Sequence, residues 1–190
     1  MRGAATAVSV HVYALWVSVG REVKLLKVHH RADFIEKGRG LLRWERTMTE
    51  LDSIRVAREN VEAYNAGDWQ RLEAVLAPDV VYHEVGSQRR LQGAEQMIQA
   101  YQGWKQAFPD DGKGTITNAF ASGNLVLIEV TWMGTQTGPF VGPGETFPQS
   151  GKAFNASGAQ VITIEGGKIQ ELHQYFDLMT ILQQIGAMPK

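Results

Sequence analysis

The sequence predicts an α+β fold in which helices come first along the chain and a curved, mainly antiparallel sheet follows. Between residues 50 and 108 apolar side chains recur every three or four positions, the spacing of amphipathic helices. Between residues 115 and 176 the chain instead shows strand-like runs separated by Gly-containing turns. Helices that precede a meander of strands commonly cover one face of the sheet. We therefore expect a cone with three N-terminal helices, a short C-terminal helix and an apolar pocket inside.

The three N-terminal helices are predicted one after another. Residues 50–66 carry one apolar stripe, and Gly67 ends that helix. Asp68 stands at the N-cap position of a short second helix, which Pro78 terminates. The third helix is expected over residues 94–108, where Met, Tyr, Trp and Phe recur at helical spacing.

Five segments have the character of strands. One lies between the second and third helices, and four follow the third: 80–85, 115–122, 125–133, 153–165 and 168–176. A Gly-Asn pair and a Gly-Gly pair mark two tight turns between them, which favours hairpins. The segment 134–151 is rich in Gly and Pro and is expected to form a loop that serves as a lid or a partner surface.

Composition indicates a globular protein, with 44% hydrophobic and 21% charged residues among 190. The net charge of −1 hides an uneven distribution. Residues 1–47 hold nine Lys or Arg against four Asp or Glu, whereas residues 48–190 hold ten against sixteen. There is no cysteine, so a thiol nucleophile and a Cys-based zinc site are excluded.

The basic segment 1–47 is expected to be an extension outside the native core, and the domain proper to span 48–190. Its apolar run, 4–19, is short for a membrane-spanning helix and lacks the flanks of a secretory signal. Met48 resembles a natural start that leads into a helix, so we interpret 1–47 as an upstream extension of the reading frame that is disordered or not part of the core. A membrane-surface anchor and a mobile basic arm are the alternatives.

The last predicted strand carries a row of titratable side chains. Because side chains alternate between the faces of a strand, Glu171, His173, Tyr175 and Asp177 are expected on the same face. If that face lines a pocket, Asp177 can act as a general acid or base. Asp177 also precedes the helical pattern that starts at residue 178, so it is equally placed to be an N-cap.

Two histidines and several aromatic residues are further candidates. His83 in the first strand, and His173 beside the carboxylate in the last, titrate near neutral pH and can assist proton transfer. Aromatic side chains at strand and helix spacing can line an apolar pocket, although they can equally be plain core: Tyr64, Trp104, Trp132 and Tyr175.

Six short motifs occur in order between about residue 51 and residue 186, and together they resemble a known family. They lie at 64–69 (YNAGDW), 77–81 (APDVV), 108–110 (FPD), 134–140 (GTQTGPF), 150–152 (SGK) and 167–186 (GKI to QIG). This pattern resembles the SnoaL-like polyketide cyclase and ester cyclase branch of the nuclear-transport-factor-like superfamily, whose members have the cone-shaped, cystatin-like α+β fold.

The resemblance implies a cofactor-independent cyclase or isomerase that acts on a small apolar carbonyl compound. In such cyclases a carboxylate on the last strand is the acid-base group of an intramolecular aldol condensation, and Asp177 matches it. Two positions depart from the usual pattern, where Gln136 stands for His and Glu129 for Arg. Gln136 can still bind a carbonyl or hydroxyl group of a substrate but cannot transfer a proton near pH 7. Superfamily relatives commonly pair through the open sheet face, so a homodimer is expected.

Two other functions fit the same fold. One is a non-catalytic ligand-binding or dimerisation module, which the changes at Gln136 and Glu129 favour. The other is water activation like that of an epoxide hydrolase, which requires an arginine on a strand; Arg89 and Arg90 are expected in a loop instead.

Several partner classes receive no support from the sequence. Residues 48–190 contain no metal-binding or nucleotide-binding motif, and their acidic balance disfavours nucleic acid. We therefore expect no metal, no cofactor, no membrane partner for the core domain and a cytoplasmic location.

Overall fold

The computed structural model describes residues 15–19, 22–26, 34–142 and 145–188, and their side chains from residue 49 onward. The chain divides into two compact units between Arg43 and Trp44, close to the predicted boundary at residue 48. In the first unit β1 (Leu15–Val19) and β2 (Glu22–Leu26) form an antiparallel pair. That residues 1–47 are an extension outside the native core stays a prediction.

The first helix is longer than the apolar stripe predicts. Helix α1 runs from Phe34 to Ala66, whereas the prediction began at residue 50. Residues 34–50 contain no proline, and Gly38 and Gly40 weaken a helix without ending it. At its C-terminal end the side chain of Asn65 forms two 2.8 Å hydrogen bonds with the backbone N–H and C=O of Gly114, which tie α1 to the sheet.

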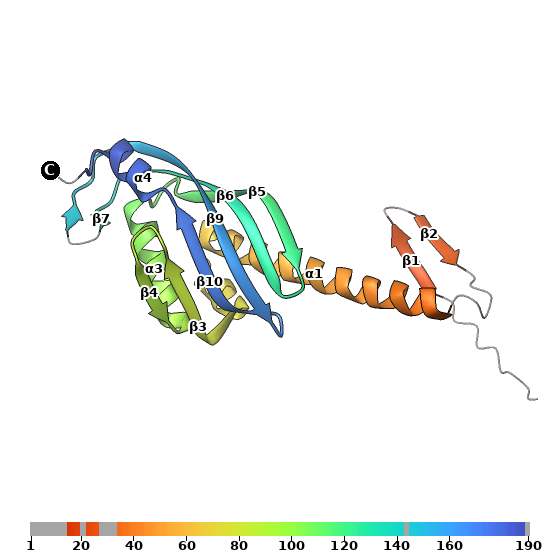
Figure 1. Ribbon diagram of the computed structural model, residues 1–190. Helices are drawn as coiled ribbons and strands as arrows, with labels where there is room; N and C mark the ends of the chain where they lie inside the picture. The colour runs from red at the N-terminus through yellow and green to blue at the C-terminus, as the bar shows by residue number, and fades with distance from the viewer. Residues whose placement is uncertain (1–14, 20–21, 27–33, 143–144, 189–190) are drawn as a thin grey trace, which may run out of the picture. The chain divides into compact units, whose positions relative to one another are not determined.

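A six-stranded sheet forms the body of the second unit, in the order β4-β3-β10-β9-β6-β5. The strands are β3 (Leu76–Glu84), β4 (Arg89–Gln92), β5 (Lys113–Ser122), β6 (Leu125–Thr135), β9 (Ala153–Glu165) and β10 (Lys168–Phe176). Only β3 and β10 pair in parallel; the other neighbours in this sheet are antiparallel. Figure 1 shows the long strands β5, β6 and β9 curving along their length. The predicted curved, mainly antiparallel sheet is confirmed.

Strand β4 corrects the expectation that Arg89 and Arg90 lie in a loop. Both residues pair with β3, Arg89 opposite Glu84 and Arg90 opposite His83. The segment is short, charged and at the edge of the sheet, so it lacks the apolar alternation from which strands are recognised.

Helices α1, α2 (Trp69–Val75) and α3 (Ala94–Ala107) pack on one face of this sheet, which we call the inner face. Val61 of α1, Leu72 of α2 and Met97 of α3 are at most 1% exposed and share a core cluster with inner-face residues of the strands. Asp68 caps α2 as predicted, since its carboxylate accepts a 3.0 Å hydrogen bond from the N–H of Arg71. The C-terminal helix α4 (Leu178–Ile185) contributes to a second apolar cluster with Phe108 and Phe154.

The predicted Gly-Gly turn connects β9 and β10. Gly166 and Gly167 have φ values of 58° and 73°, and two consecutive positive φ angles are the requirement of the type I′ hairpin turn that glycine satisfies without strain. The register that follows places Leu172 opposite Ile162 and Gln174 opposite Gln160.

The predicted loop at 134–151 contains a small sheet of its own, formed by β7 (Phe140–Val141) and β8 (Thr146–Phe147). Phe140 is buried in the second apolar cluster, so this loop is anchored to the fold. Among the described residues, no helix is both long and apolar enough to cross a membrane. The cytoplasmic location stays a prediction.

Candidate functional site

Strands β3 and β10 lie side by side and present opposite sets of residues to the two faces of the sheet. The inner face receives Tyr82 and Glu84 from β3, and Gln174 and Phe176 from β10, of which only Phe176 is not fully buried. The intervening residues point to the opposite, outer face. Gln174 and Glu84 are register partners, so the side chains of these two polar residues are neighbours on the inner side.

A cavity lies between the inner face and the helices. Its lining is mostly aromatic: Tyr64, Tyr82, Glu84, Tyr101, Trp104, Phe108, Gly112, Lys113, Trp132, Met133, Phe154, Gln174, Phe176 and Ile181. About 510 Å³ is free of atoms, open solvent at the mouth included, and about 50 Å³ of this can hold the centre of a water-sized sphere. We call this space the inner cavity. Its narrowness between flat rings suits a flat, apolar ligand.

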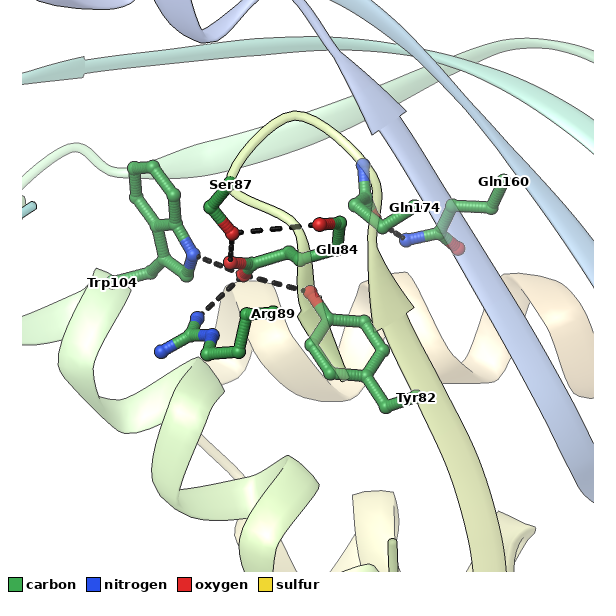
Figure 2. A network of polar contacts seen from close by, with 7 residues as sticks. All are labelled: Tyr82, Glu84, Ser87, Arg89, Trp104, Gln160 and Gln174. Carbon is green, nitrogen blue, oxygen red and sulfur yellow. Dashed lines mark hydrogen bonds and ion pairs between the residues drawn. The ribbon is translucent and has the colours of Figure 1, made fainter. Parts of the chain in front are cut away.

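Glu84 is the carboxylate of this cavity, and it is 1% exposed. Its Oε1 accepts hydrogen bonds from the Tyr82 hydroxyl at 2.9 Å, the Trp104 indole N–H at 2.7 Å and the Arg89 guanidinium at 2.6 Å. Its Oε2 accepts one, from the Ser87 hydroxyl at 2.7 Å. Figure 2 shows these four donors grouped around the carboxylate. A buried carboxylate is stable only with such partners, so this network is a requirement of the fold as well as a feature of the site.

The turn between β3 and β4 supplies one of these donors, Ser87, and the first residue of β4, Arg89, supplies another. In this turn the backbone N–H of Val85 donates a 2.9 Å hydrogen bond to the carbonyl of Gln174, which holds the turn against the end of β10. Gln88 has a φ of 56°, the left-handed conformation that costs a residue with a Cβ about 1 kcal/mol. Ser87 precedes this position and Arg89 follows it, so the strained residue places both donors on Glu84.

A second chain of buried polar side chains crosses the fold from α3 to β10. The Tyr101 hydroxyl donates to Oδ1 of Asn60 at 3.4 Å, and Nδ2 of Asn60 donates to Oε1 of Gln160 at 3.1 Å. Nε2 of Gln160 then donates to Oε1 of Gln174 at 2.5 Å. We call these four residues the amide relay; its last step is drawn in Figure 2.

Burial keeps the tyrosines of the cavity in their neutral form. Removal from water raises the pKa of Tyr64, of Tyr101 and of Tyr82, the last also because the negative charge of Glu84 is close. They therefore act as hydrogen-bond donors. Among the described residues, the buried indole N–H of Trp132 and the buried Nε–H of Arg89 have no hydrogen-bond partner.

Asp177 lies outside the inner cavity. Its exposed carboxylate caps α4, accepting hydrogen bonds from the N–H of Thr180 at 2.9 Å and from the Thr180 hydroxyl at 2.6 Å. These two bonds, the hydroxyl's first, lower the pKa of Asp177. The capping role left open by the sequence is therefore present, whereas its proton-transfer role stays a prediction.

The other predicted proton-transfer residues lie on the outer face. His83 and His173 are register partners there, with ring centroids 5.5 Å apart, and Nε2 of His173 is 3.0 Å from Oε1 of Glu171. Tyr175 is 43% exposed on the same face. Tyr175 and Asp177 border an open groove, which we call the outer groove, with about 1020 Å³ free of atoms, open solvent included. Neither histidine lines the inner cavity.

The predicted ligand-binding residues divide into two groups. Tyr64, Trp104 and Trp132 line the inner cavity together, as expected for a pocket wall. Gln136 does not: it is fully buried in the 134–151 loop, where its amide N–H groups bond three backbone carbonyls and its oxygen accepts from Ser150. Its substrate-binding role is not supported by contacts with the cavity. Glu129, exposed on β6, bonds Asn118.

Sequence reasoning missed the polar residues of the inner face. Glu84 and Gln174 could both have been recognised from the alternation of side chains along their strands. Glu84 shares a face of β3 with Tyr82, and Gln174 shares a face of β10 with Leu172. A charged or amide side chain at an apolar position of a strand is the signal. Asn60 and Gln160 carry the same signal on α1 and β9. Within the part of the chain that the structure describes, no group of three His, Asp or Glu side chains is placed to hold a metal ion.

Comparison with known proteins identifies the family. The model of the SnoaL-like polyketide cyclase family matches residues 54–185. Among solved structures, a protein from Jannaschia sp. CCS1 assigned to the SnoaL-like polyketide cyclases is 21% identical, with a TM-score of 0.66, and the match covers 74% of this chain and 96% of that one. TsrD from Streptomyces laurentii is 25% identical, with a TM-score of 0.63 and coverages of 73% and 97%.

IdmH from Streptomyces antibioticus, assigned as a polyketide cyclase, is also 25% identical, with a TM-score of 0.61 and coverages of 70% and 98%. No curated protein matches the sequence. The predicted family and its cone-shaped fold are confirmed. The chain belongs to the SnoaL-like polyketide cyclase family.

Proposed function

We propose that the protein is a cofactor-independent cyclase or isomerase that acts on a small apolar carbonyl compound bound in the inner cavity. The observation that carries this proposal is the position of Glu84, a carboxylate 1% exposed in the wall of an aromatic cavity. Acid-base chemistry next to a carbonyl group requires a base inside a space from which water is excluded. Family membership supports the same class of reaction.

The donors around Glu84 leave room for a proton. Three of them converge on Oε1, whereas Oε2 accepts only from Ser87. A carboxylate oxygen has two lone pairs, so Oε2 keeps one acceptor site. In the proposed step, Oε2 takes a proton from the carbon next to the substrate carbonyl, the C–H electron pair becomes the enolate, and the proton returns at the end of the rearrangement. The neutral hydroxyl of Tyr64 is available as a donor to the substrate.

Exchange of hydrogen for deuterium tests this step without knowledge of the substrate. Indanone, a flat bicyclic ketone, exchanges the protons next to its carbonyl in heavy water, and proton NMR follows the rate. We expect the protein to accelerate exchange and Glu84→Gln to lower the acceleration about 100-fold, the usual size of one acid-base contribution. His83→Gln, on the outer face of the same strand, is the matched control.

Asp177→Asn decides between the two carboxylates in the same assay. Retention of the rate by Asp177→Asn supports Glu84 as the acid-base group. If Asp177→Asn loses the rate and Glu84→Gln retains it, the acid-base group is Asp177 and the site belongs to the outer groove.

A non-catalytic ligand-binding module is the second candidate, and the same network favours it. Four donors hold Glu84 in one position, and a buried carboxylate with such partners can serve the fold alone, without a chemical step. Binding of indanone without acceleration of exchange would support this candidate.

Water activation of the epoxide-hydrolase kind requires an arginine on a strand. Arg89 in β4 meets this requirement, since it pairs with Glu84. Water activation also requires a second carboxylate on the same water. Among the described residues that line the inner cavity, Glu84 is the only carboxylate, so this function has the weakest support.

The proposal includes a homodimer formed through the outer face of the sheet. Large apolar side chains stand exposed there, including Phe120 at 59%, together with Leu125 and Leu127 of the neighbouring strand. Such a patch favours a partner surface. Sizing chromatography at micromolar concentration tests it: a dimer that Phe120→Glu converts to a monomer is expected, and a monomeric wild-type protein would contradict it.

A further inference from the structure

Gln174 presents an unused pair of hydrogen-bond donors to the inner cavity. Its side chain is 5% exposed and lines the cavity, and its Oε1 is occupied by Gln160. Its Nε2 makes no hydrogen bond among the described residues. An amide N–H at the wall of a mostly aromatic cavity gains a hydrogen bond when a ligand or a water molecule supplies an acceptor. We infer that Nε2 of Gln174 binds the carbonyl oxygen of the ligand, an inference that rests on the proposed function of the cavity.

The amide relay determines which end of Gln174 faces the ligand. The buried hydroxyl of Tyr101 keeps its proton, because burial raises the pKa of that hydroxyl, and it donates to Asn60. From there each amide accepts through its oxygen and donates through its nitrogen, so the relay ends with the oxygen of Gln174 occupied and its nitrogen free. A donor held in this way is oriented before the ligand arrives, which is the arrangement that stabilises developing negative charge on oxygen.

The position beside Glu84 gives this donor a function in the reaction. Gln174 and Glu84 are register partners in parallel strands, which lie about 4.8 Å apart. A ketone whose oxygen accepts from Gln174 can therefore place its neighbouring carbon at Glu84. When the proton moves from this carbon to Glu84, the negative charge appears on the oxygen that Gln174 binds.

The same pair limits the class of ligand. Glu84 has a single positive partner among its contacts, Arg89, which is already engaged with it. A carboxylate ligand would bring a second negative charge into a water-poor space, so it would be repelled. Beside Glu84 and Gln174 the site is therefore expected to take the carbonyl of a neutral ketone, aldehyde or ester rather than a carboxylate. Lys113, a cation of the cavity lining, is exposed at the start of β5.

The first experiment compares indanone with indane, which has the same rings without the carbonyl group. Dissociation constants are measured by ligand-observed NMR for the full chain and for Gln174→Met, which keeps the length of the side chain but removes the amide. We expect Gln174→Met to weaken indanone binding about five-fold, the effect of one neutral hydrogen bond, and to leave indane unchanged. Tyr175→Phe, the outer-face neighbour, should change neither.

The outcomes separate this inference from the proposed function. Equal changes for the two compounds, or none, would overturn the role of Gln174 even if the exchange of indanone protons remains accelerated. Loss of exchange in Glu84→Gln with the five-fold effect of Gln174→Met retained would support both. Failure of both compounds to bind the wild-type protein would overturn the inference together with the ligand-binding cavity, and binding of indane without binding of indanone would overturn the inference alone.

A second measurement on the wild-type protein covers the case in which Gln174→Met does not fold. The side-chain amide protons of Gln174 are assigned by NMR, and their chemical shifts are followed during titration. Indanone should move them downfield, whereas indane and benzoate should not. No downfield movement with bound indanone would contradict the inference.

Discussion

The two faces of strands β3 and β10 carry different chemistry, although their residues alternate along the same segments. The outer face holds His83, His173 and Tyr175, whose rings lie at the surface or close to it. The inner face holds Glu84 and Gln174, which are buried and fixed by partners from other elements. The difference teaches that titratable residues are conspicuous in a sequence wherever they lie, whereas a site depends on which of them share an enclosed space.

The largest expected difference between the faces concerns stability. Leu172→Ala removes a side chain that is 0% exposed in the main core, so it should lower the free energy of unfolding by about 3 kcal/mol. His173→Ala, the next residue on the outer face, should cost less than about 1 kcal/mol. Urea unfolding measures both. Similar losses would mean that the outer face is as closely packed as the inner one.

The donors of Glu84 sharpen the comparison further. Trp104→Phe keeps an aromatic ring but removes the 2.7 Å hydrogen bond to the carboxylate, and we expect a loss of about 2 kcal/mol. Tyr175→Phe removes a hydroxyl on the outer face and should stay within about 0.5 kcal/mol of wild type. A negligible effect of Trp104→Phe in urea unfolding would show that three donors satisfy Glu84.

A smaller effect of opposite sign is expected at Gln88. Its positive φ serves the inner face by placing Ser87 and Arg89, and glycine adopts this conformation without strain. Gln88→Gly should therefore raise the free energy of unfolding by about 0.5 kcal/mol or slightly more. Gln92→Gly, in the regular strand β4, should lower it. Destabilisation by both variants in thermal unfolding would exclude strain at Gln88.

The smallest effect concerns pH and the surface carboxylate Asp177. Its pKa is lowered in the folded protein by Thr180, so its contribution to stability is present above the unfolded pKa of about 3.9 and is lost as pH falls through the folded value. Asp177→Asn keeps a capping side chain without the charge. The stability difference between the two proteins should be constant from pH 5 to pH 7 and shrink below about pH 4. A difference that grows toward acid would contradict the lowered pKa.

The regular elements were predictable because their signals are local. The cap of α2 at Asp68, the Gly-Gly turn at 166–167 and the helix that starts after Asp177 each depend on residues close in sequence. Strand β4 and the N-terminal part of α1 were not, because neither has a regular apolar pattern. The wall residues Tyr64, Trp104 and Trp132 were recognised from their type alone.

The sequence by itself determined the order of the main helices and strands, the helix cap at Asp68 and the family, because propensity, periodicity and motifs act over short distances. Only the tertiary structure decided that Glu84 and Gln174 face the cavity while His83 and His173 face away from it. The parity within each strand was visible, but which side of the sheet the helices cover was not. That choice depends on the total apolar surface that the helices and the sheet bury together, which is a property of contacts between residues far apart in the chain.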